Sequence, residues 1–226
     1  AVVTNIDPEH LDYYQGIEQI KEAFLQFIER IPFFGLAVLC LDQENVQDLI
    51  PQLRKRLTTY GLSSQADFQA KDMSFDGPQT SFELVHMGKP IGKLTVQMPG
   101  IHNVCNVLAT VATAFELDVD FKTVQEALAG FSGIQRRFQK KADIEDILVF
   151  DDYGHHPTEI KATLRAAKRG WRRRVVALFQ PHRYTRTKAL FDDFLTAFYE
   201  ADVLVITDIY PAGEEEIEGV DARHLF

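Results

Sequence analysis

Leu36-Ala37-Val38-Leu39-Cys40-Leu41 is an uninterrupted apolar run of strand length, and it decides the fold class. A strand buried on both faces reads as such a run, whereas a half-buried strand alternates. Before the run, apolar residues over 17–31 recur at helical spacing and end at Pro32. After it, residues 58–62 predict another short strand. Strands that alternate with helices indicate an α/β fold with a parallel sheet covered on both faces.

The middle of the chain departs from this alternation. Polar and apolar residues alternate on either side of Gly88-Lys89-Pro90, which predicts an antiparallel hairpin. Gly130 and Gly133 later interrupt the pattern, and we expect a domain boundary that gives domains of residues 1–133 and 134–226. The expected segments are a helix near 45–55, hairpin strands at 81–86 and 93–98, and helices at 104–115 and 121–129.

The remaining residues restart the strand–helix alternation. This pattern predicts a second, doubly wound α/β unit that lacks its later strands. The expected strands are 147–150, 175–179 and 203–206, and the expected helices are 158–167 and 189–200.

Composition narrows the class of protein. There are 24 Lys and Arg against 33 Asp and Glu, and a net charge of −9 argues against a nucleic-acid partner. No apolar run approaches the roughly 18 residues of a spanning helix, so no membrane insertion is expected. Cys40 and Cys105 lie in apolar segments without metal-type spacing, which favours a reduced, cytoplasmic compartment.

The two ends of the chain indicate an internal piece of a larger protein. Residues 1–6 begin without Met and read as a strand already in progress, and residues 221–226 read as the start of a helix. The sequence also contains no G-x-x-x-x-G-K-[ST] phosphate-binding motif.

Polar residues are dense after three successive strands of the second unit. Ligands bind beyond the carboxyl ends of the strands in open parallel sheets, so three such loops side by side predict a lined cleft. Each residue alone is as well explained by a loop that satisfies its own backbone groups, and the clustering favours a site. The loops are Asp151-Asp152-Tyr153-Gly154-His155-His156-Pro157-Thr158-Glu159, Gln180-Pro181-His182-Arg183-Tyr184-Thr185-Arg186-Thr187 and Asp208-Ile209-Tyr210-Pro211-Ala212-Gly213-Glu214.

The chemistry of these loops suits an anionic ligand. Pro157 fits a first helical position, which places His155 and His156 at a helix N-terminus that disfavours the imidazolium form. Arg183 and Arg186 share a face if they lie on one helical turn, and together they suit a carboxylate or a phosphate.

Two patches of the first unit have a similar position. Residues 5–12 follow the opening strand, and His10 among them is either structural or close to a metal-bound phosphate. Residues 99–106 begin a helix, where Asn103 either reads an adenine edge or caps the helix.

Taken in order, these motifs resemble the Mur ligases over essentially the whole chain. Within that family, the second-unit loops resemble the members that use L-alanine as the amine. The segments that carry the resemblance are 4–12, 99–106, Gly133-Ile134-Gln135-Arg136-Arg137-Phe138, 151–159, 178–187 and 210–214.

The resemblance implies part of a central ATP-binding domain, with a parallel sheet, helices and an antiparallel hairpin, followed by part of a Rossmann-like C-terminal domain. It implies a cytoplasmic enzyme of peptidoglycan precursor synthesis that activates the carboxylate of UDP-N-acetylmuramate with ATP and Mg²⁺ as an acyl phosphate. The amine of L-alanine then attacks and phosphate leaves. The 226 residues alone are expected to be inactive, because the phosphate loop is missing from them.

Site residues follow from the same resemblance. His10 would serve the magnesium site, which is unusual because Mg²⁺ prefers oxygen ligands. Asn103 and Asn106 would serve the adenine, and Arg137 or Arg136 the nucleotide. Two alternatives stay open, a murein-peptide ligase of cell-wall recycling and a non-catalytic module that binds an anionic metabolite. The residues expected at the catalytic end are Asp152, Tyr153, His155, Arg183 and Arg186.

Overall fold

The computed structural model describes residues 1–9 and 13–225. The chain forms two compact units, the first of Ala1–Phe75 with Gln79–Phe131 and the second of Asp76–Pro78 with Ser132–Phe226. None of the helices within the described residues is long and apolar enough to cross a membrane.

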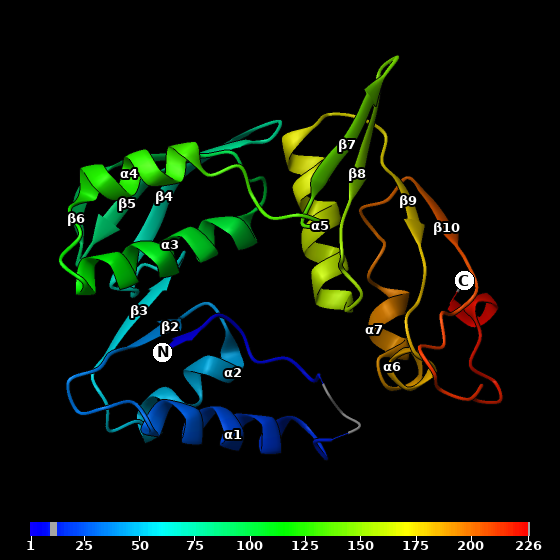
Figure 1. Cartoon of the computed structure of the whole chain (residues 1–226), viewed down its shortest axis with the longest axis horizontal. Helices are drawn as coiled ribbons and strands as arrows, with labels where there is room; N and C mark the ends of the chain where they lie inside the picture. Colours follow the sequence, from blue (N-terminus) through cyan, green and yellow to red (C-terminus); the bar gives the residue numbers. More distant parts are fainter. Residues whose placement is uncertain (10–12, 226) are drawn as a thin grey trace. The chain divides into compact units, whose positions relative to one another are not determined.

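The first unit is built on one six-stranded sheet with the order β1-β2-β3-β4-β5-β6 (Figure 1). Neighbouring strands from β1 to β4 pair in parallel, and β5 and β6 form the predicted antiparallel hairpin. The strands are β1 (Val2–Val3), β2 (Ala37–Cys40), β3 (Leu57–Gly61), β4 (Phe68–Asp76), β5 (Gln79–His86) and β6 (Lys89–Val96).

Strand β2 is buried at every residue, as its apolar run predicts. Val38 and Cys40 pack into one core under α3 (Ile101–Glu116) and α4 (Phe121–Gly130). The alternate residues Ala37 and Leu39 pack into a second core under α1 (Ile17–Glu29). Successive side chains of a strand point to opposite faces, so the two cores lie on the two faces of the sheet. The α/β class is confirmed.

One predicted helix of the first unit is wrong. Residues 45–55 form a short helix α2 (Glu44–Gln47) and a separate 3-10 turn, η1 (Ile50–Gln52). Pro51 has no backbone N–H to continue the α-helical ladder, and it disfavours the α conformation at the residue before it. No strand is predicted at β4, where only Met73 and Phe75 beyond the first three residues are half-buried and the others are polar and exposed.

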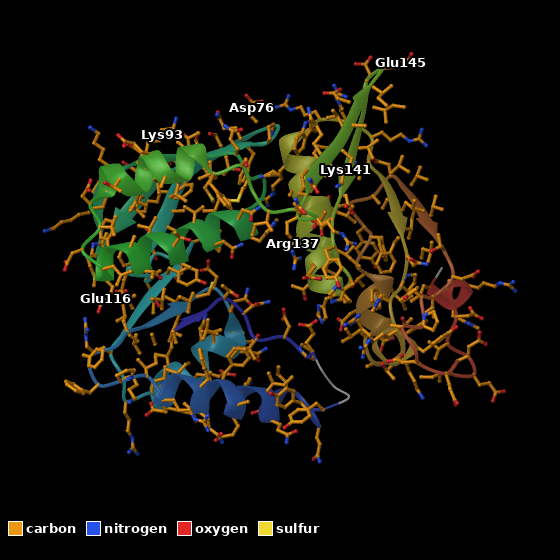
Figure 2. All side chains as sticks on the ribbon, in the orientation of Figure 1. Asp76, Lys93, Glu116, Arg137, Lys141 and Glu145 are labelled. Atoms are coloured by element: carbon orange, nitrogen blue, oxygen red, sulfur yellow. The ribbon has the colours of Figure 1, made fainter. Side chains whose placement is uncertain are left out.

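The second unit contains two small sheets. Strands β7 (Gln139–Ile144) and β8 (Ile147–Asp151) form an antiparallel hairpin whose tip includes Glu145 (Figures 1 and 2). Strands β9 (Val176–Phe179) and β10 (Val203–Ile206) pair in parallel. Helix α5 (Pro157–Gly170) contributes Ile160 and Leu164 to a core with Phe179 and Phe194. The strand–helix alternation is confirmed, whereas the sequence analysis did not predict β7.

The helix predicted at 189–200 is displaced towards the N-terminus. Two short helices, α6 (Tyr184–Ala189) and α7 (Phe191–Leu195), replace it. The Glu214 carboxylate accepts hydrogen bonds from the Thr185 N–H at 3.0 Å and from the Thr185 hydroxyl at 2.7 Å. A helix needs partners for its first N–H groups, and here a residue distant in sequence supplies one. Arg183 and Arg186 therefore stand at a helix start rather than in a loop.

Candidate active site

The N-terminus of α5 is fixed by a reciprocal cap. His156 is the capping residue, and its Nδ1 accepts the Thr158 N–H at 3.3 Å. Glu159 reaches back and accepts the N–H groups of His155 at 3.0 Å and His156 at 3.3 Å. Such a capping box satisfies donors that the helix leaves unpaired and fixes the direction of the entering chain. The position of His155 is therefore set by Glu159.

Glu159 also binds Arg137. The Arg137 guanidinium donates to Glu159 Oε1 at 3.0 Å, which places Arg137 beside α5 (Figure 2). Partial burial opposes ionisation of Glu159, but hydrogen bonds from the His155 N–H and from Arg137 outweigh it and lower the pKa of Glu159. Glu159 is thus an anion that joins the start of the second unit to the head of α5.

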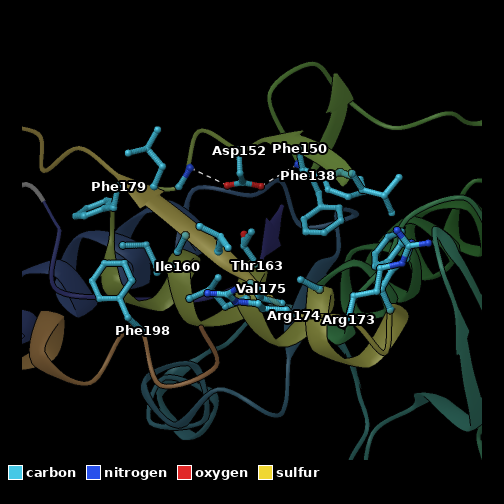
Figure 3. Close-up of a pocket in the computed structure, with 18 of the residues that line it drawn as sticks. Phe138, Phe150, Asp152, Ile160, Thr163, Arg173, Arg174, Val175, Phe179 and Phe198 are labelled. Carbon is cyan, nitrogen blue, oxygen red and sulfur yellow. Dashed lines mark hydrogen bonds between the residues drawn. The ribbon is translucent and has the colours of Figure 1, made fainter. Parts of the chain in front are cut away.

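Asp152 organises the backbone around it. One of its oxygens accepts the Phe138 N–H at 2.8 Å and the other accepts the Gly154 N–H at 2.7 Å, both drawn in Figure 3. The carboxylate therefore ties the chain before β7 to the turn that carries Tyr153 and His155. Its contacts are those of a residue that positions others.

Arg136 lies over the Tyr153 ring, with its guanidinium carbon 4.5 Å from the ring centroid. The Tyr153 N–H donates to the Arg136 carbonyl at 2.7 Å, and the Arg136 Nε is 3.8 Å from an oxygen of Asp151. A cation over an aromatic face is attracted by the ring quadrupole. Arg136 and Tyr153 are thus held together from two segments of the unit.

Histidine rings from two of the predicted loops approach each other. The rings of His155 and His182 are 6.4 Å apart between centroids, and His182 stacks on Tyr210 of the third loop at 5.3 Å. His155 Nδ1 lies 3.0 Å from the Tyr153 carbonyl, which only accepts, so Nδ1 is the donor of this hydrogen bond. Burial, and then the charge of Arg186, lower the pKa of His182.

The two arginines have different partners. The Arg186 guanidinium donates to the His182 carbonyl at 3.1 Å, and an Arg183 nitrogen is 3.7 Å from a carboxylate oxygen of Glu214. Arg183 has φ 73°, a left-handed conformation that costs energy in a residue with a side chain, and its N–H donates to the Tyr210 carbonyl at 2.8 Å. The three predicted loops therefore meet within the second unit.

The first unit holds the remaining candidates. Asn103, in the first turn of α3, donates from Nδ2 to the Pro99 carbonyl at 2.8 Å. Asn106 Nδ2 is 3.5 Å from Asn103 Oδ1. Asn103 therefore fastens the start of α3. His10 lies outside the described residues.

A cavity of about 850 Å³ lies between the hairpin, α5 and β9 in the second unit. Asp152 is one of its lining residues, and most of the other side chains are apolar (Figure 3). Among the described residues, Tyr153, His155, Arg183 and Arg186 do not line it. The cavity is distinct from the polar cluster. Its apolar lining includes Phe138, Phe150, Ile160, Trp171, Leu178 and Phe198.

Two family profiles together match nearly the whole chain. Residues 1–114 match the Mur ligase middle domain, and residues 136–226 match the Mur ligase glutamate ligase domain.

The chain belongs to the Mur ligase family.

The predicted resemblance is confirmed, and curated relatives of high identity share one name, UDP-N-acetylmuramate–L-alanine ligase. The UDP-N-acetylmuramate–L-alanine ligase of Geotalea daltonii is 60% identical over 225 residues, which are 100% of this chain and 49% of the relative. The ligase of the same name from Geobacter sulfurreducens is 57% identical over 227 residues, 100% of this chain and 49% of the relative. The chain thus spans about half the length of these relatives.

Solved structures of the family have the same fold. A crystal structure of the UDP-N-acetylmuramate–alanine ligase of Thermotoga maritima matches with a TM-score of 0.74 at 30% identity, over 92% of this chain and 45% of that one. A murein peptide ligase of Psychrobacter arcticus matches with a TM-score of 0.61 at 28% identity, over 91% of this chain and 42% of that one.

Sequence reasoning assigned no role to four residues that shape the polar cluster. Glu159 and Glu214 hold helix starts, and His182 and Tyr210 join two loops by stacking. Glu159 three residues after a capping position is a capping-box signal that the sequence contains. The pairing of Glu214 with Thr185 spans 29 residues and has no local signal.

Proposed function

We propose that this chain is the nucleotide-binding and amino-acid-binding part of an ATP-dependent ligase. The ligase joins L-alanine to the carboxylate of UDP-N-acetylmuramate in cytoplasmic peptidoglycan precursor synthesis. In this proposal residues 1–133 belong to the central domain and residues 134–226 to the C-terminal domain. The names of the relatives and their identity over the whole chain support this substrate pair.

The gathering of three loops around His182 carries the proposal. The rings of His155 and Tyr210 both lie near the His182 ring, and Arg186 binds the His182 backbone carbonyl. A carboxylate substrate needs cationic donors, and a nucleophilic amine must lose a proton to a nearby acceptor. Both kinds of group occur within this cluster.

Each residue of the cluster has a task in the proposal. Arg183 and Arg186 bind the alanine carboxylate or the charge that develops on the transferred acyl phosphate. His155, held at the N-terminus of α5 by Glu159, takes the proton of the attacking amine. Tyr153 borders the muramyl end under Arg136, and Asp152 is a positioning residue because its two oxygens bind backbone N–H groups.

The described residues fit the base end of a nucleotide. Asn103 keeps one Nδ2 hydrogen for an adenine edge, and its Oδ1, which accepts from Asn106, has a second lone pair to offer. The resemblance to the Mur ligases assigns Arg137, with Arg136 as the alternative, to the nucleotide, and within the second unit Arg137 donates to Glu159. ATP, when bound, would supply the phosphoryl group that activates the acid. The resemblance assigns His10, which lies outside the described residues, to the Mg²⁺ that would balance the charge of the phosphates.

A chimera tests this function. Residues 1–226 replace the matching segment of the Geotalea daltonii ligase, to which they align over their whole length. We expect phosphate release from ATP that requires both UDP-N-acetylmuramate and L-alanine, at a rate near that of the unmodified relative. The unmodified relative is the positive control.

The acceptor panel separates the alternatives. Turnover with a muropeptide tripeptide and not with L-alanine would identify a murein-peptide ligase and overturn the substrate assignment. A folded chimera that binds anionic metabolites but releases no phosphate with any amine would indicate a non-catalytic module instead.

A further inference from the structure

The first unit contains a cluster of metal-binding side chains that belongs to no part of the proposed ligase site. Cys40, Asp42 and Cys105 each offer one donor atom, and the three atoms lie within 4.8 Å of one another. Cys40 ends β2, Asp42 follows it, and Cys105 projects from α3. No local spacing connects the two cysteines, so only the fold brings them together.

The cluster runs from the core to the surface. Cys40 is buried, Cys105 is half-buried and Asp42 is exposed. An ion can therefore enter from the Asp42 side and reach a sulfur that solvent does not reach. Such an entry path is one of the requirements of a real metal site.

The carboxylate of Asp42 is already oriented. Its two oxygens accept the N–H groups of Leu62 at 2.5 Å and Ser63 at 3.0 Å. Metal-binding carboxylates are commonly held by hydrogen bonds of this kind, which fix the direction of the remaining lone pairs. Gly61 lies beside the carboxylate, where a Cβ would come within 2.7 Å of both oxygens. The Asp42 carboxylate thus fits against the backbone because Gly61 has no side chain.

The two sulfurs come from opposite partners in the fold, Cys40 from the end of β2 and Cys105 from α3. The thiolate and not the thiol is the metal ligand, so binding of a cation here would replace the thiol protons and hold both sulfurs as thiolates.

We propose that Cys40 Sγ, Cys105 Sγ and an oxygen of Asp42 bind a Zn²⁺ ion, with water as the fourth ligand. Thiolates select borderline-soft cations, so this set excludes Mg²⁺ as the natural occupant. Two thiolates on tetrahedral zinc lie about 3.8 Å apart, given Zn–S bonds of ~2.3 Å, so the two sulfurs, at most 4.8 Å apart, have to approach by about an ångström at most. The ion would tie the end of β2, the loop after β3 and α3 together.

Cobalt substitution tests the site on the 226-residue chain itself. Co²⁺ is added to the reduced chain and followed by absorbance. We expect one ion per chain, with the near-ultraviolet thiolate-to-cobalt band and the strong visible bands of tetrahedral cobalt. Zn²⁺ in equal amount should abolish both, because thiolate sites prefer zinc to cobalt. The seven histidines of the chain give no thiolate band, so adventitious binding to them is distinguished.

Variants assign the ligands. Cys105→Ser keeps the size of the side chain and should weaken Zn²⁺ binding by at least about 100-fold, since even indirect partners of a metal site are worth 10- to 100-fold. Asp42→Asn keeps the side chain's shape and should weaken binding by about 10-fold. Glu126→Gln, an exposed carboxyl on α4, is the control and should change nothing.

Circular dichroism without metal shows whether each variant is folded. If Cys105→Ser is not folded, Cys105→Ala replaces it in the binding measurement. Absence of the thiolate band in the reduced wild-type chain would overturn the proposal. The proposal would also be overturned if folded Cys105→Ser bound Zn²⁺ with the same affinity as the wild-type chain. Without reductant, loss of both free thiols together with 2 Da of mass would show that Cys40 and Cys105 form a disulfide. If the reduced chain then binds no cobalt, the pair is a disulfide and not a metal site.

Discussion

Strands β2 and β9 have nearly the same sequence character and opposite environments. Both are four residues long and wholly apolar, Ala37–Cys40 against Val176–Phe179. Every residue of β2 is buried, with Leu39 at 0% exposure, whereas Leu178 in β9 is 74% exposed. Strand β2 pairs with β1 and β3 and has a core on each face. In the described residues β9 pairs only with β10.

The difference shows what an apolar run does and does not encode. The run specifies an extended segment that is favourable to bury, but neighbouring elements decide whether water is excluded. In the first unit these neighbours are present on both edges and both faces. In the second unit β8 and β9 border a cavity rather than each other. Four predictions test this contrast, from the largest effect to the smallest.

The same substitution at matched leucines should have very different costs. Leu39→Ala leaves a cavity in a closed core and should lower the free energy of unfolding by about 2–5 kcal/mol. Leu178→Ala should change it by less than about 0.5 kcal/mol, because that side chain is already in water. Urea unfolding followed by circular dichroism measures both. Equal costs would mean that the environments of β2 and β9 do not differ as described.

Loss of Arg183 should affect turnover rather than stability. In the chimera, Arg183→Ala removes contacts to a carboxylate or to transition-state charge of ~2–4 kcal/mol, which is roughly 30- to 1000-fold in kcat/KM. Arg183→Lys should rescue little, because a point charge does not reproduce the guanidinium fork. Steady-state kinetics with L-alanine and a urea curve for each variant measure the two effects. Near-normal kinetics for the lysine variant would contradict the role given to Arg183.

Glu159 should make the second unit sensitive to acid. Its pKa is lower in the folded chain than in the unfolded one, where it is about 4.3. The stabilisation is therefore fully present above that value and is lost as the pH falls through the lower folded pKa. Glu159→Gln should cost about 1 kcal/mol at pH 7 and flatten the loss at low pH.

Trp171, the single tryptophan, lies in the second unit and reports this unfolding by fluorescence. Glu145→Gln, at the exposed tip of the hairpin, is the matched control (Figure 2). If Glu159→Gln has the same pH profile as the wild-type chain, the capping box contributes no linked stability.

Addition of Mg-ATP should have the smallest effect on the free energy of unfolding, and this effect should fall on the well-packed first unit. Asn103 and its neighbours offer a base a few hydrogen bonds of about 1 kcal/mol each, which must offset several kcal/mol of lost rigid-body freedom. The sequence has no phosphate-binding loop motif to add to them. At ~1 mM Mg-ATP and a Kd of ~1 mM or weaker, the chain gains less than about 0.4 kcal/mol of stability. Isothermal titration that gives a micromolar Kd, weakened by removal of Mg²⁺, would show an intact phosphate site.

The sequence predicts elements best where the pattern is local and long. Helices α1, α3, α4 and α5 and strand β2 follow from spacing, caps and apolar runs, because each is stabilised chiefly by its own side-chain pattern. The second predicted helix fails at Pro51, which a stricter use of the proline rule would have found. The start of α6 is missed for another reason, because its first turn is completed by Glu214, a residue distant in sequence.

The candidate site also has features that the sequence predicts and features that it does not. The sequence names the three loops and the residue types, since motifs after strand ends are visible along the chain. It does not show that Asp152 uses both oxygens on backbone groups, or that His182 stacks between loops. Those contacts join segments far apart in sequence, so no periodicity or spacing carries them.

The sequence by itself determined the α/β class, the family and the loops that hold the candidate site, because short-range patterns and motif order encode them. Only the tertiary structure decided which apolar strand is buried and which loops meet. It also brought Cys40 to Cys105, two residues whose spacing predicts no metal site. The burial of the strands, the meeting of the loops and the approach of the two cysteines have the same physical reason. Burial and ligand geometry depend on what packs across space, and that arrangement is a property of the whole fold rather than of any segment.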